Sequence, residues 1–488
     1  MSKKNNLYLL LFCVGLAAYG CGASGTSTTE TLNSNDQQTN TVLNGVMLTN
    51  SMQGQSVGLV DADGDGTADK VVGAPYAAVS SQTGAVIVYK GSSSGFSAEP
   101  ASLLTGDNNF GSSIVKLEKG SSDTSEKFAV GAINGDGIDV SLCGSVAVYQ
   151  AGSSGPQFLV KLSGEGPMDK FGYSLASGDF NGDGKTDIAI GAPYHNPAPS
   201  LYRQGAVYIY LGPDFGTKIA LRASSANKGL ARAVAAGDIN GDGIADLIIS
   251  ASGKVLGFYG GTSFAPTIGS PDVTISSSAS GFGKSIAVIG DIDADGKGEI
   301  AIGAPNAVIT LSSVSSRDTG SVHIIKGGTG IRSISNADTS TDKIVRVDGG
   351  ALFDRFGSSI VPVGDVDGDG KPDFAVGSTM ADVNANDLSG KVYLFKGKDI
   401  SAGTTLANST SFSGTIKDQA YGTFLSSTGD GKLLIGAPNS NMNTGGVIVV
   451  DLATGEVVAD GGTGGTGGGG DGHDHDHDHA PVFETDTE

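Results

Sequence analysis

Five short acidic segments repeat one order of oxygen-bearing side chains along the chain. Each follows the pattern D-x-[D/N]-x-D-G-x-x-[D/E], so positions 1, 3, 5 and 9 carry side-chain oxygens and position 6 is glycine. Calcium prefers several oxygen ligands in a flexible shell, and a backbone carbonyl at position 7 would add one more. The predicted calcium ligands are Asp61, Asp63, Asp65, Thr67 and Asp69; Asp179, Asn181, Asp183, Lys185 and Asp187; Asp238, Asn240, Asp242, Ile244 and Asp246; Asp291, Asp293, Asp295, Lys297 and Glu299; and Asp365, Asp367, Asp369, Lys371 and Asp373.

These segments differ from EF-hands, which need a glutamate at position 12 and flanking helices. Position 12 is apolar here and opens a run of strand length, so each segment is predicted to be a hairpin turn: Val72, Ile190, Ile249, Ile302 and Val376. An Asp-Gly turn without metal is the alternative. Close carboxylates without a cation would repel one another, so the pattern favours about five calcium sites.

Each acidic segment belongs to a longer repeat, whose fullest copy spans residues 171–193 and reads FGYSLASGDFNGDGKTDIAIGAP. Each copy contains four runs of strand length, which is typical of a propeller blade. The sequence therefore predicts an all-β fold, a seven-bladed β-propeller. The copies begin near Gln53, Phe110, Phe171, Leu230, Phe282, Phe356 and Tyr421, and those at Phe110 and Tyr421 lack the acidic segment.

Closure of the ring requires a fourth strand for the last blade. The N-terminal segment 42–50 precedes the first repeat and is predicted to complete that blade. A strand over residues 456–459 is the alternative.

The Phe-Gly start, acidic loop and Gly-Ala-Pro finish resemble FG-GAP repeats, the units of the seven-bladed propeller of integrin alpha chains and of many bacterial surface proteins. The resemblance covers residues 41–460, about the whole predicted propeller. The Phe-Gly is degenerate at Gln53 and Leu230, and Gly-Ala-Pro is missing at Ser250 and Ser378. The resemblance implies a non-catalytic adhesion module that binds calcium.

The segments after each Gly-Ala-Pro vary in length and composition. Because consecutive strands run antiparallel, these segments are expected on the face opposite the acidic loops. Variable loops on a rigid scaffold often carry binding, and the integrin resemblance implies the same face for a protein or glycan partner. The aromatic and cationic candidates are Tyr76, Tyr194, His195, Tyr202 and Arg203, with ordinary solvated loop residues as the alternative.

The N-terminus reads as an export signal over residues 1–20, with two lysines followed by an apolar run. The stretch before Cys21 resembles a bacterial lipobox, which implies acylation of Cys21 and a membrane-anchored lipoprotein at the outer membrane or cell surface. An ordinary secretory signal with an incidental cysteine is the alternative. Residues 21–40 are rich in Ser, Thr and Asn and are predicted to form a disordered tether.

The C-terminal segment 461–488 combines a glycine-rich linker with alternating His and Asp. The histidines could chelate Zn²⁺ or Ni²⁺, and a solvated polar tail is the alternative. These residues are His473, His475, His477 and His479. The formal charge of -21 disfavours nucleic acid and anionic lipid as partners, because both would be repelled.

Two other functions compete with the adhesion module. Propellers also host lyases and hydrolases, but only His195 and His323 lie in the predicted propeller, and no HExxH motif is present. The sequence therefore argues against an extracellular enzyme. A metal-sequestering envelope protein is the other alternative, through the C-terminal histidines.

Overall fold

The computed structural model describes residues 42–43, 46–47, 51–79, 82–92, 95–117, 125–137, 140–196, 203–223, 229–311, 314–383, 388–427, 431–440 and 445–458. Cys21, Tyr202 and the four C-terminal histidines lie outside these residues, as do the predicted signal, tether and linker. Within the described part, no helix is long and apolar enough to cross a membrane. Regular structure there is β-strand apart from short 3-10 turns at Thr329–Ile331, Gly397–Asp399 and Leu406–Asn408.

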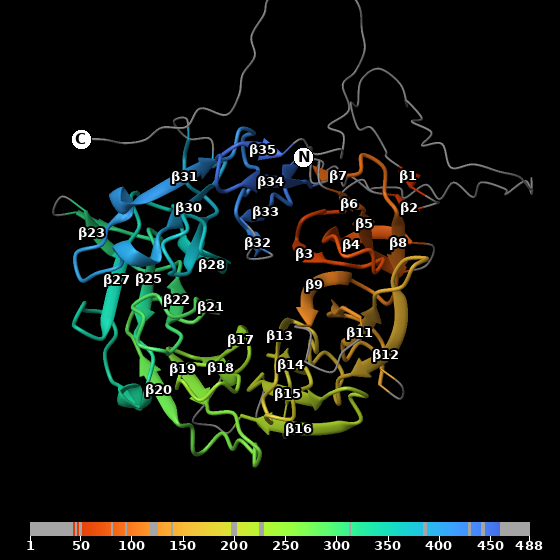
Figure 1. Cartoon of the computed structure of the whole chain (residues 1–488), viewed down its shortest axis with the longest axis horizontal. Helices are drawn as coiled ribbons and strands as arrows, with labels where there is room; N and C mark the ends of the chain where they lie inside the picture. Colours follow the sequence, from red (N-terminus) through yellow and green to blue (C-terminus); the bar gives the residue numbers. More distant parts are fainter. Residues whose placement is uncertain are drawn as a thin grey trace, which may run out of the picture.

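The strands form consecutive antiparallel units of four, which Figure 1 shows arranged around a ring. The units are β3 (Ser56–Val60), β4 (Asp69–Val79), β5 (Gln82–Tyr89) and β8 (Ser102–Thr105); β9 (Phe110–Leu117), β10 (Lys127–Ala132), β11 (Ser145–Gln150) and β12 (Gln157–Ser163); β13 (Ser174–Gly178), β14 (Asp187–Ala192), β15 (Ala206–Leu211) and β16 (Thr217–Arg222); β17 (Val234–Gly237), β18 (Asp246–Ala251), β19 (Lys254–Phe258) and β20 (Val273–Ser276); β21 (Ser285–Val288), β22 (Ile300–Ala304), β25 (Ser321–Ile325) and β27 (Ile344–Asp348); β28 (Phe356–Gly364), β29 (Asp373–Ser378), β30 (Lys391–Phe395) and β31 (Ser409–Ser413); and β32 (Phe424–Ser427), β33 (Lys432–Gly436), β34 (Val447–Asp451) and β35 (Val457–Val458). The predicted all-β, propeller-type architecture is confirmed.

Short additional strands decorate these units. They are β1 (Val42–Leu43), β2 (Val46–Met47), β6 (Gly91–Ser92), β7 (Gly95–Phe96), β23 (Ile309–Leu311), β24 (Val314–Ser316) and β26 (Ser333–Ile334). The pairs β6–β7 and β23–β24 are small hairpins, and β26 runs parallel to β20.

The second strand of each unit is buried on both faces because the units stack side by side around the ring. Every residue of β14 is buried, and so is every residue of β18. Their continuous apolar sequences follow from this position, since both faces of the strand contact neighbouring units. The fourth strands lie at the outside of the ring, and β12 accordingly exposes Phe158 and Leu159.

The glycine of each Phe-Gly pair lies where two units approach closely. Gly172 has a φ of 88°, a backbone conformation that disfavours other residues. A Cβ atom at Gly172 would lie 2.9 Å from the carbonyl oxygen of Ser145 in the preceding unit. Phe171 is fully buried in a cluster with Val146 of that unit, and its ring meets those of Tyr208 and Tyr210 at a tilt and edge-on. The Phe-Gly motif therefore specifies the contact between neighbouring units.

A serine two residues after the glycine ties each of five units to the next one, and we call these hydrogen bonds the serine latches. Each serine hydroxyl donates to a backbone carbonyl at the Phe-Gly position of the following repeat. The latches run from Ser56 to Gly111 (2.7 Å), Ser113 to Gly172 (2.6 Å), Ser174 to Ala231 (3.0 Å), Ser285 to Gly357 (2.8 Å) and Ser359 to Gly422 (2.6 Å). Ala233 and Phe424 occupy the same place in the other two repeats and have no hydroxyl.

The predicted closure of the ring by segment 42–50 is wrong. β1 and β2 pair with each other, and β2 pairs with β4 of the first unit. The outer strand of the last unit is β35, which pairs with β34. A tight turn between β34 and β35 explains why the neighbouring segment forms the outer strand. The side chain of Asp451 accepts the N–H groups of Ala453 (3.0 Å) and Thr454 (3.2 Å), which reverses the chain directly after β34.

The last unit instead meets the first through an apolar cluster. Val57, Leu59 and Val72 of the first unit pack with Leu434, Val447 and Val449 of the last. One parallel bridge between Gln53 and Gly445 adds to this contact. The ring therefore closes by side-chain packing rather than by a strand contributed from the N-terminus.

Candidate metal centres and the opposite face

Each of the five acidic loops connects the first two strands of a four-strand unit, as the sequence predicted. The loops lie between β3 and β4, β13 and β14, β17 and β18, β21 and β22, and β28 and β29. All five therefore lie on the same face of the ring, because the first strands of all units run in the same direction.

The carboxylate at position 9 of each loop is at most 1% exposed and fixes the loop to its own unit. One of its oxygens accepts the backbone N–H of position 2, and the other accepts the N–H of a glycine after the third strand. Asp187, for example, accepts from Phe180 at 3.0 Å and from Gly212 at 2.8 Å. The same two bonds join Asp69 to Ala62 and Gly91, Asp246 to Ile239 and Gly260, Glu299 to Ile292 and Gly327, and Asp373 to Val366 and Gly397.

Burial raises the pKa of these carboxyl groups. The pKa of Asp187 rises to about 6, and those of Asp246 and Glu299 rise to about 7. Burial likewise raises the pKa of Asp69 and of Asp373. In each case the two backbone N–H groups oppose the shift, and the carboxylates at other positions of the loop add to it. A bound cation would favour the ionised form at these positions.

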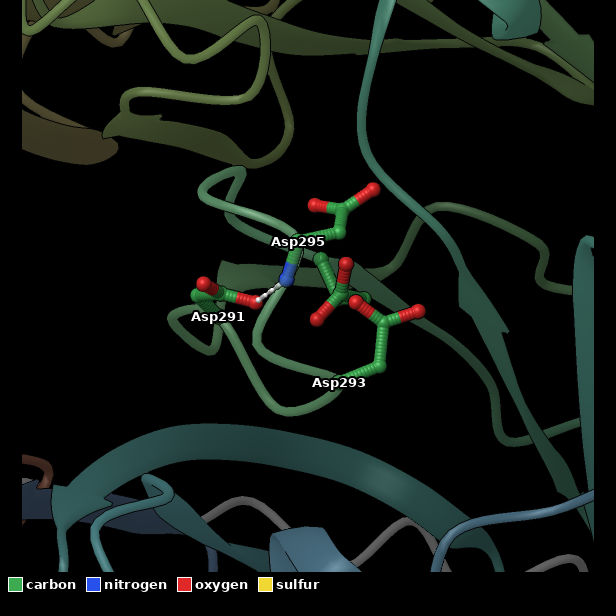
Figure 2. Close-up of side chains that lie close together, drawn as sticks. Asp291, Asp293 and Asp295 are labelled. Atoms are coloured by element: carbon green, nitrogen blue, oxygen red, sulfur yellow. Dashed lines mark hydrogen bonds between the residues drawn. The ribbon is translucent and has the colours of Figure 1, made fainter.

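The carboxylate at position 1 shapes the turn itself. One oxygen of Asp291 accepts the N–H of Asp295 at 3.0 Å (Figure 2), and the other accepts the N–H of Gly296 at 2.7 Å. Position 5 in turn accepts the N–H of position 7, as Asp295 does from Lys297 at 3.0 Å. The same contacts from position 1 to the N–H of position 6 and from position 5 to that of position 7 recur in the other four loops.

In three of the loops the carboxylates converge closely enough to share one ion. In each set the ligand oxygens lie within 4.8 Å of one another, and the sets are Asp61, Asp63 and Asp69; Asp291, Asp293, Asp295 and Glu299; and Asp365, Asp367 and Asp373. The Oδ1 atom of Asp293 is buried without a hydrogen-bond partner, although a buried carboxylate oxygen normally has one. This unpaired oxygen and the all-oxygen donor set fit a hard cation such as Ca²⁺.

The remaining two loops carry asparagine at position 3. The side-chain oxygen of Asn181 accepts the N–H of Asp183 at 3.1 Å, and that of Asn240 accepts from Asp242 at 2.9 Å. The backbone therefore follows the same turn with a neutral ligand in place of the carboxylate. Thr67, Lys185, Ile244, Lys297 and Lys371 stay predicted ligands through their carbonyl oxygens.

Four of the five predicted partner-binding residues are described and lie on the opposite face, but one of them is not accessible. Tyr76 is 46% exposed, and the guanidinium of Arg203 lies over the ring of Tyr194 at 4.5 Å. His195 is only 6% exposed, and its Nδ1 atom lies 2.8 Å from Asp169. The prediction that His195 offers its side chain to a partner is therefore wrong, because this buried pair holds the loop in place.

Exposed apolar side chains on the same face were missed from the sequence. They lie in the connections around three of the repeat starts and after three of the second strands: Leu142, Met168, Tyr173, Val308, Leu352, Phe353, Val383 and Ile416. Met168 and Phe353 have φ values of 63° and 68°, which bulky residues rarely adopt. Each stands three residues before its Phe-Gly, and this shared spacing is the signal that could have identified them.

The structure gives no support to a catalytic centre at His323. This residue is fully buried in β25, where its ring nitrogens contact the carbonyl of Ala337 at 2.7 Å and the hydroxyl of Ser321 at 3.0 Å. A nearby surface pocket contains Ser278, Asp338 and Arg346. Arg346 donates to the backbone carbonyl of Asp338 at 2.7 Å, and Ser278 donates to its carboxylate at 2.5 Å, which makes these residues structural partners of one another.

Comparison with known proteins identifies the repeat. The FG-GAP repeat family matches residues 171–210, 230–263, 282–325 and 356–395. Integrin alpha-4 of Xenopus laevis is 28% identical over 251 residues, which cover 49% of this chain and 23% of that protein. Integrin alpha-PS3 of Drosophila melanogaster is 35% identical over 158 residues, which cover 30% of this chain and 14% of that protein.

Among solved structures, Sqt1 of Saccharomyces cerevisiae aligns with 83% of this chain and 84% of its own, at 12% identity and a TM-score of 0.44. That score is too low to carry an argument. The chain spans less than a quarter of the length of the two integrin chains. The repeated units and their acidic loops define a propeller-type protein built from a recurring sequence motif. The chain contains FG-GAP repeats and resembles integrin alpha chains.

Proposed function

We propose that this protein is a non-catalytic binding module, a seven-bladed propeller that calcium stiffens on one face and that binds a protein partner with the other. The chain is exported and held at the outer membrane or cell surface through a lipid on Cys21. Similarity to FG-GAP repeats and to integrin alpha chains supports a binding module in general. The assignment of the two faces rests on the distribution of side chains over this chain.

The observation that carries the proposal is the concentration of exposed large apolar side chains on the face opposite the acidic loops. Nine of the twelve such residues in the described part lie on that face, Tyr76 near the end of β4 and the others in connections: Leu142, Met168, Tyr173, Val308, Leu352, Phe353, Val383 and Ile416. The remaining three lie on outer strands, at Phe158, Leu159 and Val457. Exposed apolar surface with polar surroundings is typical of protein interaction sites.

 These nine side chains give the face an apolar character that the acidic face lacks.

Two lysines on the same face are held by neutral amide oxygens. Lys284 Nζ donates to the amide oxygen of Asn306 at 2.8 Å, and Lys170 Nζ donates to that of Asn134. Burial lowers the pKa of Lys284, and the nearby Arg355 and Arg232 lower it further. In a chain with a formal charge of -21, cations held by neutral amides favour a partner that offers acidic groups beside apolar ones.

The test is a binding screen against purified extracellular proteins, in which every hit is measured again with a variant of this face. We expect Met168→Ser with Tyr194→Ala and Arg203→Ala to lose binding. The matched control is Phe158→Ser, which removes an exposed aromatic ring from an outer strand and should leave binding unchanged. Partners that bind the face variant as tightly as the unmodified protein would refute this assignment of the faces.

Anchoring is tested separately because Cys21 lies outside the described residues. Replacement by Cys21→Ser should release the protein from membranes, since acylation needs the thiol. A variant that stays in the membrane fraction, with no acyl chain on the unmodified protein, would contradict the lipoprotein assignment.

A further inference from the structure

Three acidic loops are contacted by lysines that lie outside the loop sequence. Lys90 Nζ lies 2.5 Å from Asp63 and 3.0 Å from Asp65. Lys326 Nζ lies 2.8 Å from Asp293. In the third loop, Lys396 and Lys398 lie 2.9 Å and 2.5 Å from Asp367. All of these lysines follow the third strand of their own unit and reach across to position 3 of the loop.

The lysines occur only where position 3 is aspartate. The lysine occupies a fixed position in its unit, directly before the glycine whose backbone N–H group donates to the carboxylate at position 9 of the loop. We compare the residue at this position in all five units. It is Lys90, Lys326 or Lys396 in the loops with Asp at position 3, and Leu211 or Tyr259 in the loops with Asn181 or Asn240. In the five loops of this chain, a carboxylate at position 3 is therefore always accompanied by the lysine, and an asparagine at position 3 never is.

The geometry leaves the inside of the loop open to a cation. Lys326 contacts the Oδ2 atom of Asp293, whereas the Oδ1 atom is the buried oxygen without a partner. The lysine thus pairs with one carboxylate oxygen of Asp293 and leaves the other without a partner. It offsets the charge of the fourth carboxylate without occupying the place of the ion.

We propose that these lysines are positioning residues that act as built-in counter-ions for the loops with four carboxylates. Their charge brings the calcium affinity of these loops close to that of the loops with three carboxylates. They stabilise the calcium-free loop and weaken calcium binding by charge repulsion, so the loops fill over a similar range of calcium concentration. The loop at Asp365 has two lysines and is the weakest calcium site of its class. The affinity statement rests on the proposed calcium function, whereas the stabilisation of the free loop does not.

The first experiment removes one lysine from the full propeller. Lys90→Met keeps the length of the side chain and deletes its charge. Calcium affinity of that loop, measured by calorimetry, should rise on the order of tenfold, because a repelling charge a few ångströms from the ion is lost. The melting temperature in EDTA should fall. Lys90→Arg should restore both values, and the exposed Lys254→Met, which removes the same charge far from any acidic loop, should change neither.

The second experiment builds the pair into a loop that lacks it. Asn181→Asp alone should tighten calcium binding at that loop and lower the melting temperature in EDTA. Adding Leu211→Lys should return both values toward those of the unmodified protein. This rescue would not follow from a purely structural role, because Leu211 packs partly in the apolar core and its replacement by itself is expected to destabilise the unit.

Two outcomes separate this inference from the proposed function. If the unmodified protein shows no calcium binding but Lys90→Met still melts earlier in EDTA than Lys254→Met, the calcium function fails and the counter-ion role stands. If calcium binds but Lys90→Met leaves both affinity and melting unchanged, the counter-ion inference is overturned and the calcium function stands.

Discussion

The two faces of the ring differ in how their loops obtain a fixed shape. On the acidic face, the same side-chain oxygens accept the same backbone N–H groups in five loops, such as Asp187 from Phe180 and Gly212. On the opposite face fewer connections share a pattern. Asp169 and Asp354 each accept the N–H group three residues earlier, but the other connections differ, and several expose side chains such as Met168 and Phe353. The repeat therefore preserves the chemistry that folds a unit and varies the chemistry that another molecule would meet.

Removal of calcium should have the largest effect on stability, and it should act through the acidic face alone. Each occupied site stabilises the folded state by RT ln(1 + [L]/Kd), which is on the order of 1 kcal/mol per site at millimolar calcium for affinities typical of extracellular modules. We expect the melting temperature measured by calorimetry to fall in EDTA and to return with calcium. An identical melt in EDTA and calcium would mean that the acidic loops are turns without a metal function.

The pH dependence should differ between the calcium-free and calcium-loaded protein. Burial raises the pKa of Asp187 to about 6 and those of Asp246 and Glu299 to about 7, above the ordinary values of 3.8 for Asp and 4.5 for Glu. A carboxyl group with a raised folded-state pKa contributes stability below its unfolded value and loses it as the pH rises through the folded value. In EDTA, stability should therefore fall between about pH 4 and 7.

Calcium should remove most of this loss, because it binds the ionised carboxylates. Denaturant unfolding at several pH values, with EDTA or calcium, measures the difference. Glu299→Gln is the control, since it deletes one titrating group and should flatten the EDTA profile. A calcium-free protein that gains stability from pH 5 to 7 would contradict the expected sign.

Removal of a serine latch should lower the stability of the protein moderately, independently of calcium and of partner binding. Ser359→Ala removes a 2.6 Å hydrogen bond to Gly422 and should lower the free energy of unfolding by about 1 kcal/mol, the usual contribution of such a bond. The same loss is expected in calcium and in EDTA. The comparison is Ser427→Ala, which removes a 2.9 Å hydrogen bond from Ser427 to the carbonyl of Lys432 within one unit, and equal losses in the two variants would argue against a special role for a bond between units.

The smallest effect on stability is expected from the exposed apolar residues. Phe353→Ser removes a ring that is 48% exposed, so the melting temperature should change little even though partner binding should weaken. Its left-handed φ of 68° does not favour phenylalanine over serine. A large loss of stability would show that Phe353 belongs to the fold rather than to the binding face.

The repeated features of the molecule could be predicted from the sequence because they arise from local patterns. The hairpin position of the acidic loops and the four-strand units follow from glycine, aspartate and apolar runs at fixed spacing. The outer strand of the last unit could not be predicted from the sequence. It is only two residues long, at Val457–Val458, and the distant segment 42–50 was a plausible strand for the same place. The burial of His195 was also missed, since its partner Asp169 lies 26 residues earlier in another connection.

Two boundaries between neighbouring units lack a serine latch, and they are secured differently. At the first, where Ala233 replaces the serine, β26 crosses from the following unit and pairs with β20. At the second, where Phe424 replaces it, the last and first units are not consecutive in the sequence and meet through apolar packing and the bridge from Gln53 to Gly445. The ring is therefore closed without a covalent link between its last and first units. When the two chain ends are pulled apart by force, the contact between these two units should separate first.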